Sequence, residues 1–284
     1  MSPDLDLSQI LRARLTKVAC LAALNVGDYL RKQFGEKHSF ETKSGRHNIV
    51  TEVDKRAEKL IIDTIKSHFP NHRFIGEESG NSGNSDEGKD GITWLIDPID
   101  GTVNFFHQIP VFCVSIAALF NNETLTGVVY QPLSHELFTA EKDSGAYLNG
   151  RKLSVTGTAV LDNMMAFTSF SYNTHENPLC CLDLFQDFAK MGIPIRQLGS
   201  SALALSYLAA GRCDGFWTTS LEPYSSAAGL LLVEEAGGSF STFDGGALSF
   251  QQSSSLIATN GLLHDQMVKK IGNTLTKANK NDHT

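Results

Sequence analysis

The stretch WLIDPIDGTVNF, residues 94–105, decides how the rest of the chain is interpreted. Residues 94–96 end an apolar run that predicts a buried β-strand. Asp97 and Asp100 follow at once, although a buried carboxylate is unfavourable unless a cation or hydrogen-bond donors lie beside it. Taken alone, Asp-Pro and Asp-Gly are common turn dipeptides, so a simple turn after the strand is the plainest interpretation.

A second pair of carboxylates favours a functional interpretation. Glu77 and Glu78 of GEES, residues 76–79, also come directly after an apolar strand. If both strands belong to one sheet, these side chains converge with Asp97 and Asp100 at a single edge. So many like charges need a counter-ion, and hard divalent cations such as Mg²⁺ take oxygen ligands.

Gly101 and Thr102 add features of a phosphate site. Glycine lets the backbone approach a ligand closely, and a helix beginning in VNFF would present free amide groups to an anion. The Thr102 hydroxyl could orient a water molecule. Carboxylates, a cation, amides and a hydroxyl together indicate metal-assisted phosphoryl hydrolysis.

The composition sets limits on this hypothesis. The chain has 284 residues, 41% of them hydrophobic and 19% charged, which is typical of a globular protein with a sizeable core. The net charge of −7 argues against nucleic acid as a ligand. The polar N-terminus and the lack of a long apolar run predict a cytoplasmic protein without membrane segments. The five cysteines are scattered, so we expect free thiols.

The pattern of apolar residues predicts an α+β protein. Helical spacing marks residues 8–34 and 51–69, and Thr51-x-x-Asp54 is typical of a capping box at the start of the second helix. Strand-like segments dominate residues 92–153, with a hairpin turn at Asn149-Gly150. Strands and helices then alternate, so we expect layered sheets and helices divided into halves at residues 1–150 and 151–284. The segment 79–91 is predicted to be a surface loop.

Four ordered motifs resemble those of the inositol monophosphatase family. They are Lys43-x₁₀-Asp54, GEES, DPIDGT and AAGLLLVEEAGG at residues 227–238, and the similarity runs from about Lys43 to Asn260. The resemblance implies a layered αβαβα sandwich, a homodimer, and Mg²⁺-dependent, lithium-sensitive hydrolysis of small phosphate monoesters.

The resemblance also assigns roles to residues. Glu77, Asp97 and the carbonyl of Ile99 are expected to hold one Mg²⁺, and Asp97 and Asp100 a second. Glu77 and Thr102, with Asp54 behind Thr102, are expected to position and activate the attacking water. The amides of Gly101 and Thr102 would face the phosphate. The rest of the substrate would contact Asp100, Gly199, Ser200 and Ser201.

Three positions depart from the family pattern. Tyr224 and Ser225 stand where a Trp-Asp pair is expected, and Thr218 where many relatives place a substrate-binding glutamate. Ser225 is expected to cap the helix that starts near Ala227, but its neutral hydroxyl is a poor Mg²⁺ ligand. The first metal site is therefore predicted to be intact and the second weakened, with Glu222 as the nearest acid that could substitute.

These departures leave more than one function open. The leading hypothesis is a Mg²⁺-dependent hydrolase of a small, inositol monophosphate-like metabolite, impaired to some degree by Ser225. One alternative is a weak or inactive relative that acts as a binding or regulatory protein. Another is a nucleotide or sugar bisphosphatase of the same superfamily, because the loss of the glutamate at Thr218 weakens the case for inositol itself.

Overall fold

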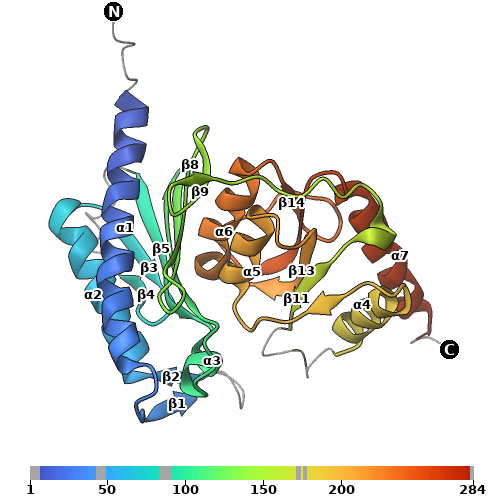
Figure 1. Ribbon diagram of the computed structural model, residues 1–284, viewed down its shortest axis with the longest axis horizontal. Coiled ribbons are helices and arrows are strands. Elements are labelled where there is room, and N and C mark those ends of the chain that lie inside the picture. The colour runs from blue at the N-terminus through green and yellow to red at the C-terminus, as the bar shows by residue number, and fades with distance from the viewer. Residues whose placement is uncertain (1–6, 43–48, 83–90, 171–173, 175–177, 282–284) are drawn as a thin grey trace, which may run out of the picture.

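The computed structural model describes residues 7–42, 49–82, 91–170, 174 and 178–281. Two large sheets and three helix pairs make five layers, as Figure 1 shows from left to right. The helices are α1 (Leu7–Gln33), α2 (Glu52–His68), α3 (Thr102–Phe106), α4 (Pro178–Lys190), α5 (Ser201–Ala209), α6 (Pro223–Glu235) and α7 (His264–Asn281), with a 3₁₀ turn at Leu161–Asn163.

The larger sheet has eight strands in the order β10-β9-β8-β7-β6-β5-β3-β4. Its strands are β3 (Arg73–Gly76), β4 (Gly80–Ser82), β5 (Ile92–Asp100), β6 (Cys113–Phe120), β7 (Glu123–Gln131), β8 (Glu136–Glu141), β9 (Gly145–Leu148) and β10 (Arg151–Lys152). The predicted hairpin joins β9 to β10, and both turn residues, Asn149 and Gly150, have positive φ.

The smaller sheet has five strands in the order β12-β11-β13-β15-β14. They are β11 (Ala166–Ser169), β12 (Ile195–Arg196), β13 (Gly215–Leu221), β14 (Ser239–Ser241) and β15 (Ser254–Thr259). A short ribbon of β1 (Phe40–Thr42) and β2 (Ile49–Thr51) lies outside both sheets. The large sheet ends at residue 152 and the small one begins at 166, while the domain boundary at residue 150 stays a prediction.

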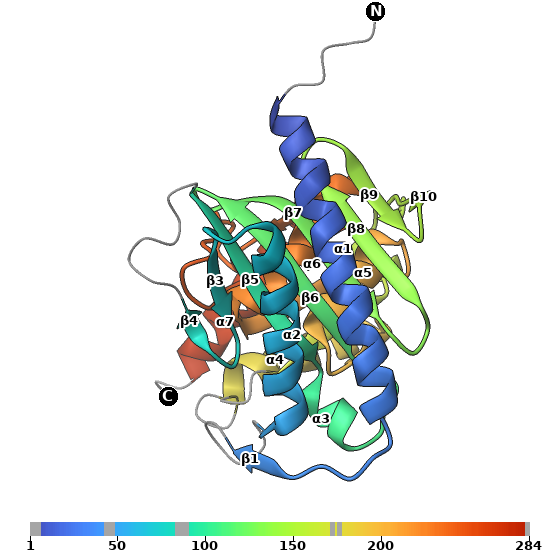
Figure 2. The same cartoon turned by 90° about the vertical axis from the view of Figure 1, so that its left-hand side faces the viewer.

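Three apolar clusters fill the spaces between the layers. Helices α1 and α2 cross the outer face of the large sheet, with Leu15, Val26 and Ile61 packed against Trp94 and its neighbours (Figure 2). Helices α5 and α6 lie between the two sheets, and α4 and α7 cover the far face of the small sheet. The predicted αβαβα sandwich is therefore confirmed.

Local sequence explains where α2 begins and which face it buries. The Thr51 hydroxyl accepts from the amide of Val53, and the Asp54 carboxylate accepts from the amide of Thr51, so the predicted capping box is present. Ala57 and Ile61 lie on the buried face, one helical turn apart. This cap fixes Asp54 at the first turn of the helix.

The prediction of a continuous loop at residues 79–91 was wrong in part. Gly80–Ser82 forms the edge strand β4, which pairs antiparallel to β3, and residues 83–90 lie outside the described part of the chain. A hairpin return to an edge strand satisfies the outer backbone groups of β3. No helix among the described residues is long and apolar enough to cross a membrane. The five cysteines are free thiols, as predicted.

Candidate active site

Strands β3 and β5 carry the two acidic motifs to one edge of the large sheet. The strands are parallel, with Gly76 opposite Ile96, and the amide of Glu77 donates to the carbonyl of Ile96 at 3.1 Å. Their carboxyl ends therefore lie side by side, with Glu77 next to Asp97. The expected convergence of GEES and DPIDGT follows from this register.

A bulge in β5 places both aspartates of DPIDGT on the same side. Asp97 lies opposite Ser115 and Asp100 lies opposite Cys113, so three steps along β5 match two steps along β6. In a regular strand, residues three apart point to opposite faces. The shift in register lies between Asp97 and Asp100, and Pro98 within it has no amide hydrogen to donate to the ladder. The bulge thus brings Asp100 round to the face that Asp97 already occupies.

Asp97 is the most deeply buried acid of the cluster, with a side chain only 1% exposed. Its Oδ2 accepts from the Ser225 hydroxyl at 2.6 Å, whereas its Oδ1 is buried without a hydrogen-bond partner. Burial raises the pKa of Asp97 well above its ordinary value, and the neighbouring Glu77 and Asp100 carboxylates add to the shift. An unpartnered buried carboxylate oxygen is a position where a cation would be stabilising.

The expected role of Ser225 as a helix cap was wrong. Helix α6 begins four residues before Ala227, with Pro223 at its first position and Glu222 at the N-cap, and no side chain makes a capping hydrogen bond. Proline suits this position because its φ is already helical and it lacks an amide hydrogen. The Ser225 hydroxyl is therefore free to point at Asp97, where it donates to a buried carboxylate instead of capping its own helix.

Asp100 is held at the N-terminus of α5. Its Oδ2 accepts from the Ser200 hydroxyl at 2.6 Å and from the Ala202 amide at 2.7 Å, and the Cys113 thiol lies 3.8 Å away. Burial raises the pKa of Asp100 to about 6, although these two donors act in the opposite direction. Ser200 and Ser201 are both buried, and their expected contact with substrate stays a prediction.

Thr102 and Asp54 form a second buried pair at the site. The Thr102 hydroxyl lies 3.1 Å from Asp54 Oδ1 and 3.0 Å from the carbonyl of Ile99, and it can donate to either. Asp54 Oδ2 is already bonded to Thr51, so the capping box also fixes the carboxylate that faces Thr102. Burial raises the pKa of Asp54. The expected arrangement, with Asp54 behind Thr102, is therefore present.

Two glycines allow the site loops to meet. Gly101 has a φ of 106°, and a Cβ there would lie 3.0 Å from the carbonyl of Val111 and 3.1 Å from that of Gly199. Gly199 has a φ of 73°, and a Cβ there would clash with the Asn104 amide. Asn104 in turn donates to the carbonyls of Val111 and Leu198 at 2.7 and 2.8 Å.

Asn104 and Ser115 are site residues that the sequence analysis missed. Asn104 ties α3 to the two loops that approach Gly101, and Ser115 donates from β6 to the carbonyl of Tyr224 at 3.1 Å. A polar residue inside the apolar strand VFCVSIAALF was a signal for Ser115. Nothing near Asn104 in the sequence marks its distant partners.

Glu222, Thr218 and Lys43 are the other residues that the sequence analysis singled out. Glu222 is partly exposed, and its pKa is raised by partial burial and then by the nearby Glu77 carboxylate. Thr218 is 1% exposed and donates to the carbonyl of Ser220 at 3.1 Å. Its hydroxyl is thus bonded within its own strand. Lys43, the start of the first motif, lies outside the described residues.

The donor set suits a hard divalent cation, although the side chains are not yet gathered around one point. Over the described ranges, no three His, Cys, Asp or Glu side chains are grouped closely enough to hold an ion as they stand. Glu77, Asp97 with its unpartnered Oδ1, Asp100 and the Ile99 carbonyl offer only oxygen ligands, which is the chemistry Mg²⁺ prefers.

Comparison with known proteins identifies the architecture. The model of the inositol monophosphatase family matches residues 11–276. The chain belongs to the inositol monophosphatase family. It is 37% identical over 267 residues to the Nus factor SuhB of Escherichia coli, covering 94% of this chain and 98% of that protein.

Two solved structures support the assignment. The inositol monophosphatase from Anabaena superposes with a TM-score of 0.82 at 34% identity, over 92% of this chain and 96% of the other. A structure of an IMPase/NADP phosphatase complexed with Mg²⁺ and phosphate gives a TM-score of 0.79 at 25% identity, over 92% and 95% of the two chains. The family resemblance and the predicted fold are therefore confirmed.

Proposed function

We propose that this family member hydrolyses a small phosphate monoester in a Mg²⁺-dependent reaction, using a water molecule as the nucleophile. The observation that carries the proposal is the unpartnered Oδ1 of Asp97, buried beside Glu77 and Asp100. Glu77, Asp97 and the Ile99 carbonyl would hold one Mg²⁺, and Asp97 and Asp100 would contribute to a second. When bound, Mg²⁺ supplies positive charge that stabilises the phosphoryl oxygens in the transition state.

The protein's own groups would position the water. If the Thr102 hydroxyl donates to Asp54, its oxygen keeps lone pairs that accept a hydrogen bond from the attacking water. The Glu77 carboxylate lies at the same edge of the sheet and would accept a proton from that water. The amides of Gly101 and Thr102 would face the phosphate, and Gly199, Ser200 and Ser201 would contact the substrate.

Ser225 modifies this chemistry at the second metal. Its hydroxyl satisfies one oxygen of Asp97 but brings no negative charge. We infer that the second Mg²⁺ binds more weakly than the first, because a divalent ion prefers charged oxygen ligands. Glu222 is the acid that we expect to supply the missing charge, because the Glu77 carboxylate raises its pKa and the two groups are therefore near each other.

A regulatory role is the second candidate, and it also rests on particular observations. A close relative carries the name Nus factor SuhB, and Ser225 removes charge from the metal centre. Under this alternative, the fold binds a protein partner and catalysis is weak or absent.

Phosphate release during a Mg²⁺ titration separates the two candidates. The proposal expects Mg²⁺-dependent release from a panel of small monoesters, with Asp97→Asn abolishing it and the exposed Asp265→Asn leaving it unchanged. Release from none of the esters at any Mg²⁺ concentration would remove the hydrolase and favour the regulatory role.

Three further family properties belong to the same proposal. We expect a cytoplasmic homodimer whose phosphate release is inhibited by lithium. Light scattering of the purified protein tests the dimer, and the same assay with LiCl tests the inhibition.

A further inference from the structure

Asn104 lies at the third position of α3 and joins segments that are far apart in the sequence. Its Nδ2 donates to the carbonyl of Val111 at 2.7 Å and to the carbonyl of Leu198 at 2.8 Å. Its backbone carbonyl accepts from the amide of Ile109 at 2.8 Å. A carboxamide NH₂ group has two hydrogens to donate, and these two bonds use both. The Asn104 side chain therefore acts on the protein's own loops and has no donor left for a substrate.

The two anchored segments lead to either side of Asp100. Val111 comes two residues before Cys113, which lies opposite Asp100 in the pairing of β5 with β6. Leu198 comes two residues before Ser200, whose hydroxyl donates to Asp100 Oδ2 at 2.6 Å. Two residues span at most about 7 Å of chain, so a displacement of either carbonyl is transmitted to the groups around the carboxylate.

Backbone carbonyls crowd this junction. The carbonyl oxygens of Val111 and Gly199 lie against Gly101, and those of Val111 and Leu198 face the Asn104 amide. Carbonyl oxygens carry partial negative charge, so they repel one another unless a donor lies between them. Gly199 leaves room for that donor, because a Cβ there would lie 2.8 Å from Asn104 Nδ2.

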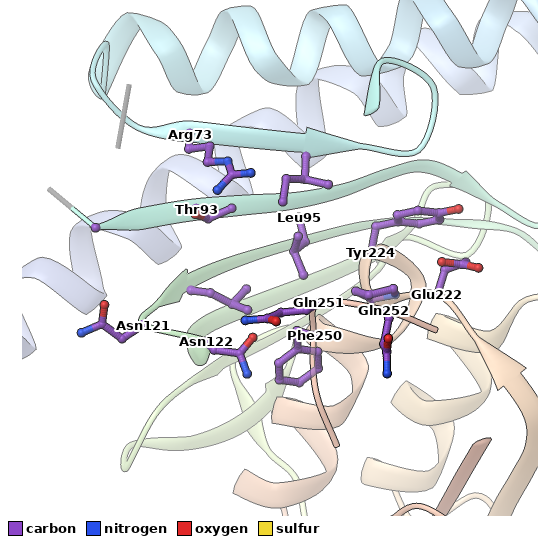
Figure 3. A pocket seen from close by; sticks show the side chains of 14 residues that line it. Arg73, Thr93, Leu95, Asn121, Asn122, Glu222, Tyr224, Phe250, Gln251 and Gln252 are labelled. Carbon is purple, nitrogen blue, oxygen red and sulfur yellow. The ribbon is translucent and has the colours of Figure 1, made fainter. Parts of the chain in front are cut away.

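Asn104 acts outside the groove that lies beside the acidic edge. This groove has a volume of about 650 Å³ and opens between the inner face of the large sheet and residues 222–224 and 250–252 (Figure 3). Its lining residues, all in the described part of the chain, include none from 101–112 or 198–202. A substitution at Asn104 therefore acts on the surroundings of Asp100 without removing a side chain of the groove.

We propose that Asn104 is a positioning residue, which fixes Asp100 for the second Mg²⁺ and holds the Ser200 segment against the acidic edge. This inference rests on the proposed hydrolase function, in which Asp100 acts as a metal ligand. Asn104 itself would touch neither the metal nor the substrate. Loss of its two bonds would let the loops separate, and a misplacement of about 1 Å can lower a rate by about 100-fold.

Two variants separate hydrogen bonding from packing at this position. Asn104→Ala removes the donor together with part of the volume, whereas Asn104→Asp keeps the shape and turns carboxylate oxygens toward the two carbonyls. The substrate is the monoester that the unmutated protein hydrolyses fastest. Both variants should lower kcat roughly tenfold to a hundredfold and raise KM by less than about fivefold, because the positioned groups act mainly in the transition state.

A near-normal kcat in Asn104→Asp would show that shape alone is needed and would overturn the proposal. If Asn104→Asp does not fold, Asn104→Ser takes its place. The serine keeps one donor on a shorter side chain, so its kcat should lie between those of Asn104→Ala and the unmutated protein. Near-normal kcat values in both Asn104→Ser and Asn104→Ala would likewise overturn the positioning role.

Asn260 provides a matched control. Its Nδ2 also donates twice, to Thr156 Oγ1 at 3.0 Å and to the carbonyl of Thr158 at 2.7 Å, and its side chain is buried. These partners belong to the segment between β10 and the 3₁₀ turn, which contributes no residue to the acidic cluster. Asn260→Ala should lower the Tm at least as much as Asn104→Ala and leave kcat within about twofold. An equal fall in kcat would attribute both effects to general destabilisation and overturn the proposal.

Mg²⁺ binding gives a readout that does not depend on turnover. In calorimetric titrations with MgCl₂, the dissociation constant should be roughly tenfold higher for Asn104→Ala than for the unmutated protein, because groups that orient a metal ligand contribute to affinity. Asn260→Ala should bind as the unmutated protein does. If no ester is hydrolysed, the hydrolase proposal fails and this titration still tests Asn104. Equal binding by all three proteins, or no binding by the unmutated protein, would overturn the positioning role.

Discussion

Replacing Ser225 by aspartate tests the central feature of the site. Ser225 donates to Asp97 Oδ2 at 2.6 Å, and both side chains are at most 9% exposed. An aspartate there would remove a donor and bring a second carboxylate to within about 4 Å of Asp97. Without a cation the change should be destabilising, and with Mg²⁺ it should favour metal binding.

The magnitude follows from two contributions. Two charges about 4 Å apart repel by about 4 kcal/mol at the effective dielectric constant of a protein site, and the lost hydrogen bond to a carboxylate adds roughly 2 kcal/mol. A proton shared by the two acids would reduce the sum, so we expect a loss of about 3–6 kcal/mol at pH 8. For a protein of this size that lowers the Tm by roughly 10 °C.

Thermal unfolding in EDTA and in MgCl₂ measures both effects. Ser225→Asn is the matched control, because it has the size of aspartate without the charge. We expect Ser225→Asp to unfold well below Ser225→Asn in EDTA and to recover in MgCl₂, because a ligand that binds only the folded state stabilises it. The Mg²⁺ concentration for half-maximal phosphate release should also fall.

Two results would refute this reasoning. Equal Tm values for the two variants in EDTA would show that the new carboxylate does not face Asp97. Tight binding of two Mg²⁺ ions by the unmutated protein, measured by calorimetry, would show that Ser225 causes no deficit.

Three other predictions concern the same site. In EDTA, stability should fall as the pH rises from about 4 through 6, because the pKa of Asp100 is raised to about 6 in the folded protein. The difference from the ordinary pKa of an aspartate corresponds to about 3 kcal/mol of unfolding free energy. Asp100→Asn should remove that part of the change in Tm. Gly101→Ala should cost about 1–3 kcal/mol in urea unfolding, because φ is 106° and two carbonyls crowd the new Cβ, whereas Gly157→Ala in open space should not. Thr102→Val should keep the Tm within a few degrees and lower phosphate release by about 100-fold or more, and a near-normal rate would exclude Thr102 from positioning the water.

Local patterns predicted most of the fold. The cap at Thr51 and the spacing of Ala57 and Ile61 are short-range signals, and α2 begins and ends within one residue of the range they indicate. The Asn149-Gly150 turn likewise fixes the β9–β10 hairpin through the backbone preferences of two adjacent residues. Such features depend on neighbours in the chain, so the sequence is sufficient to find them.

The site depends on contacts between distant residues, which local patterns do not encode. Ser225 stands just before the apolar run that begins at Ala227, so the sequence suggested a cap, yet Ser225 lies within α6 and its hydroxyl donates to Asp97, 128 residues away. Asp100 and Ser200 are 100 residues apart and share a hydrogen bond of 2.6 Å. The acid residues could be chosen from the sequence, but their hydrogen-bond partners could not, because strand register and the bulge between Asp97 and Asp100 decide which side chains meet.

The two oxygens of Asp97 have different hydrogen-bonding environments, and the proposed metal site gives the difference a meaning. A second aspartate in place of Ser225 would leave two buried carboxylates that only a cation could relieve, so the folded state would depend on the metal. The Ser225 hydroxyl satisfies Oδ2 directly and leaves Oδ1 without a partner. The Oδ2 hydrogen bond therefore contributes to stability without an ion, whereas Oδ1 would gain an interaction if a cation bound. The proposal therefore predicts a metal centre with one charge fewer and a fold that depends less on the metal.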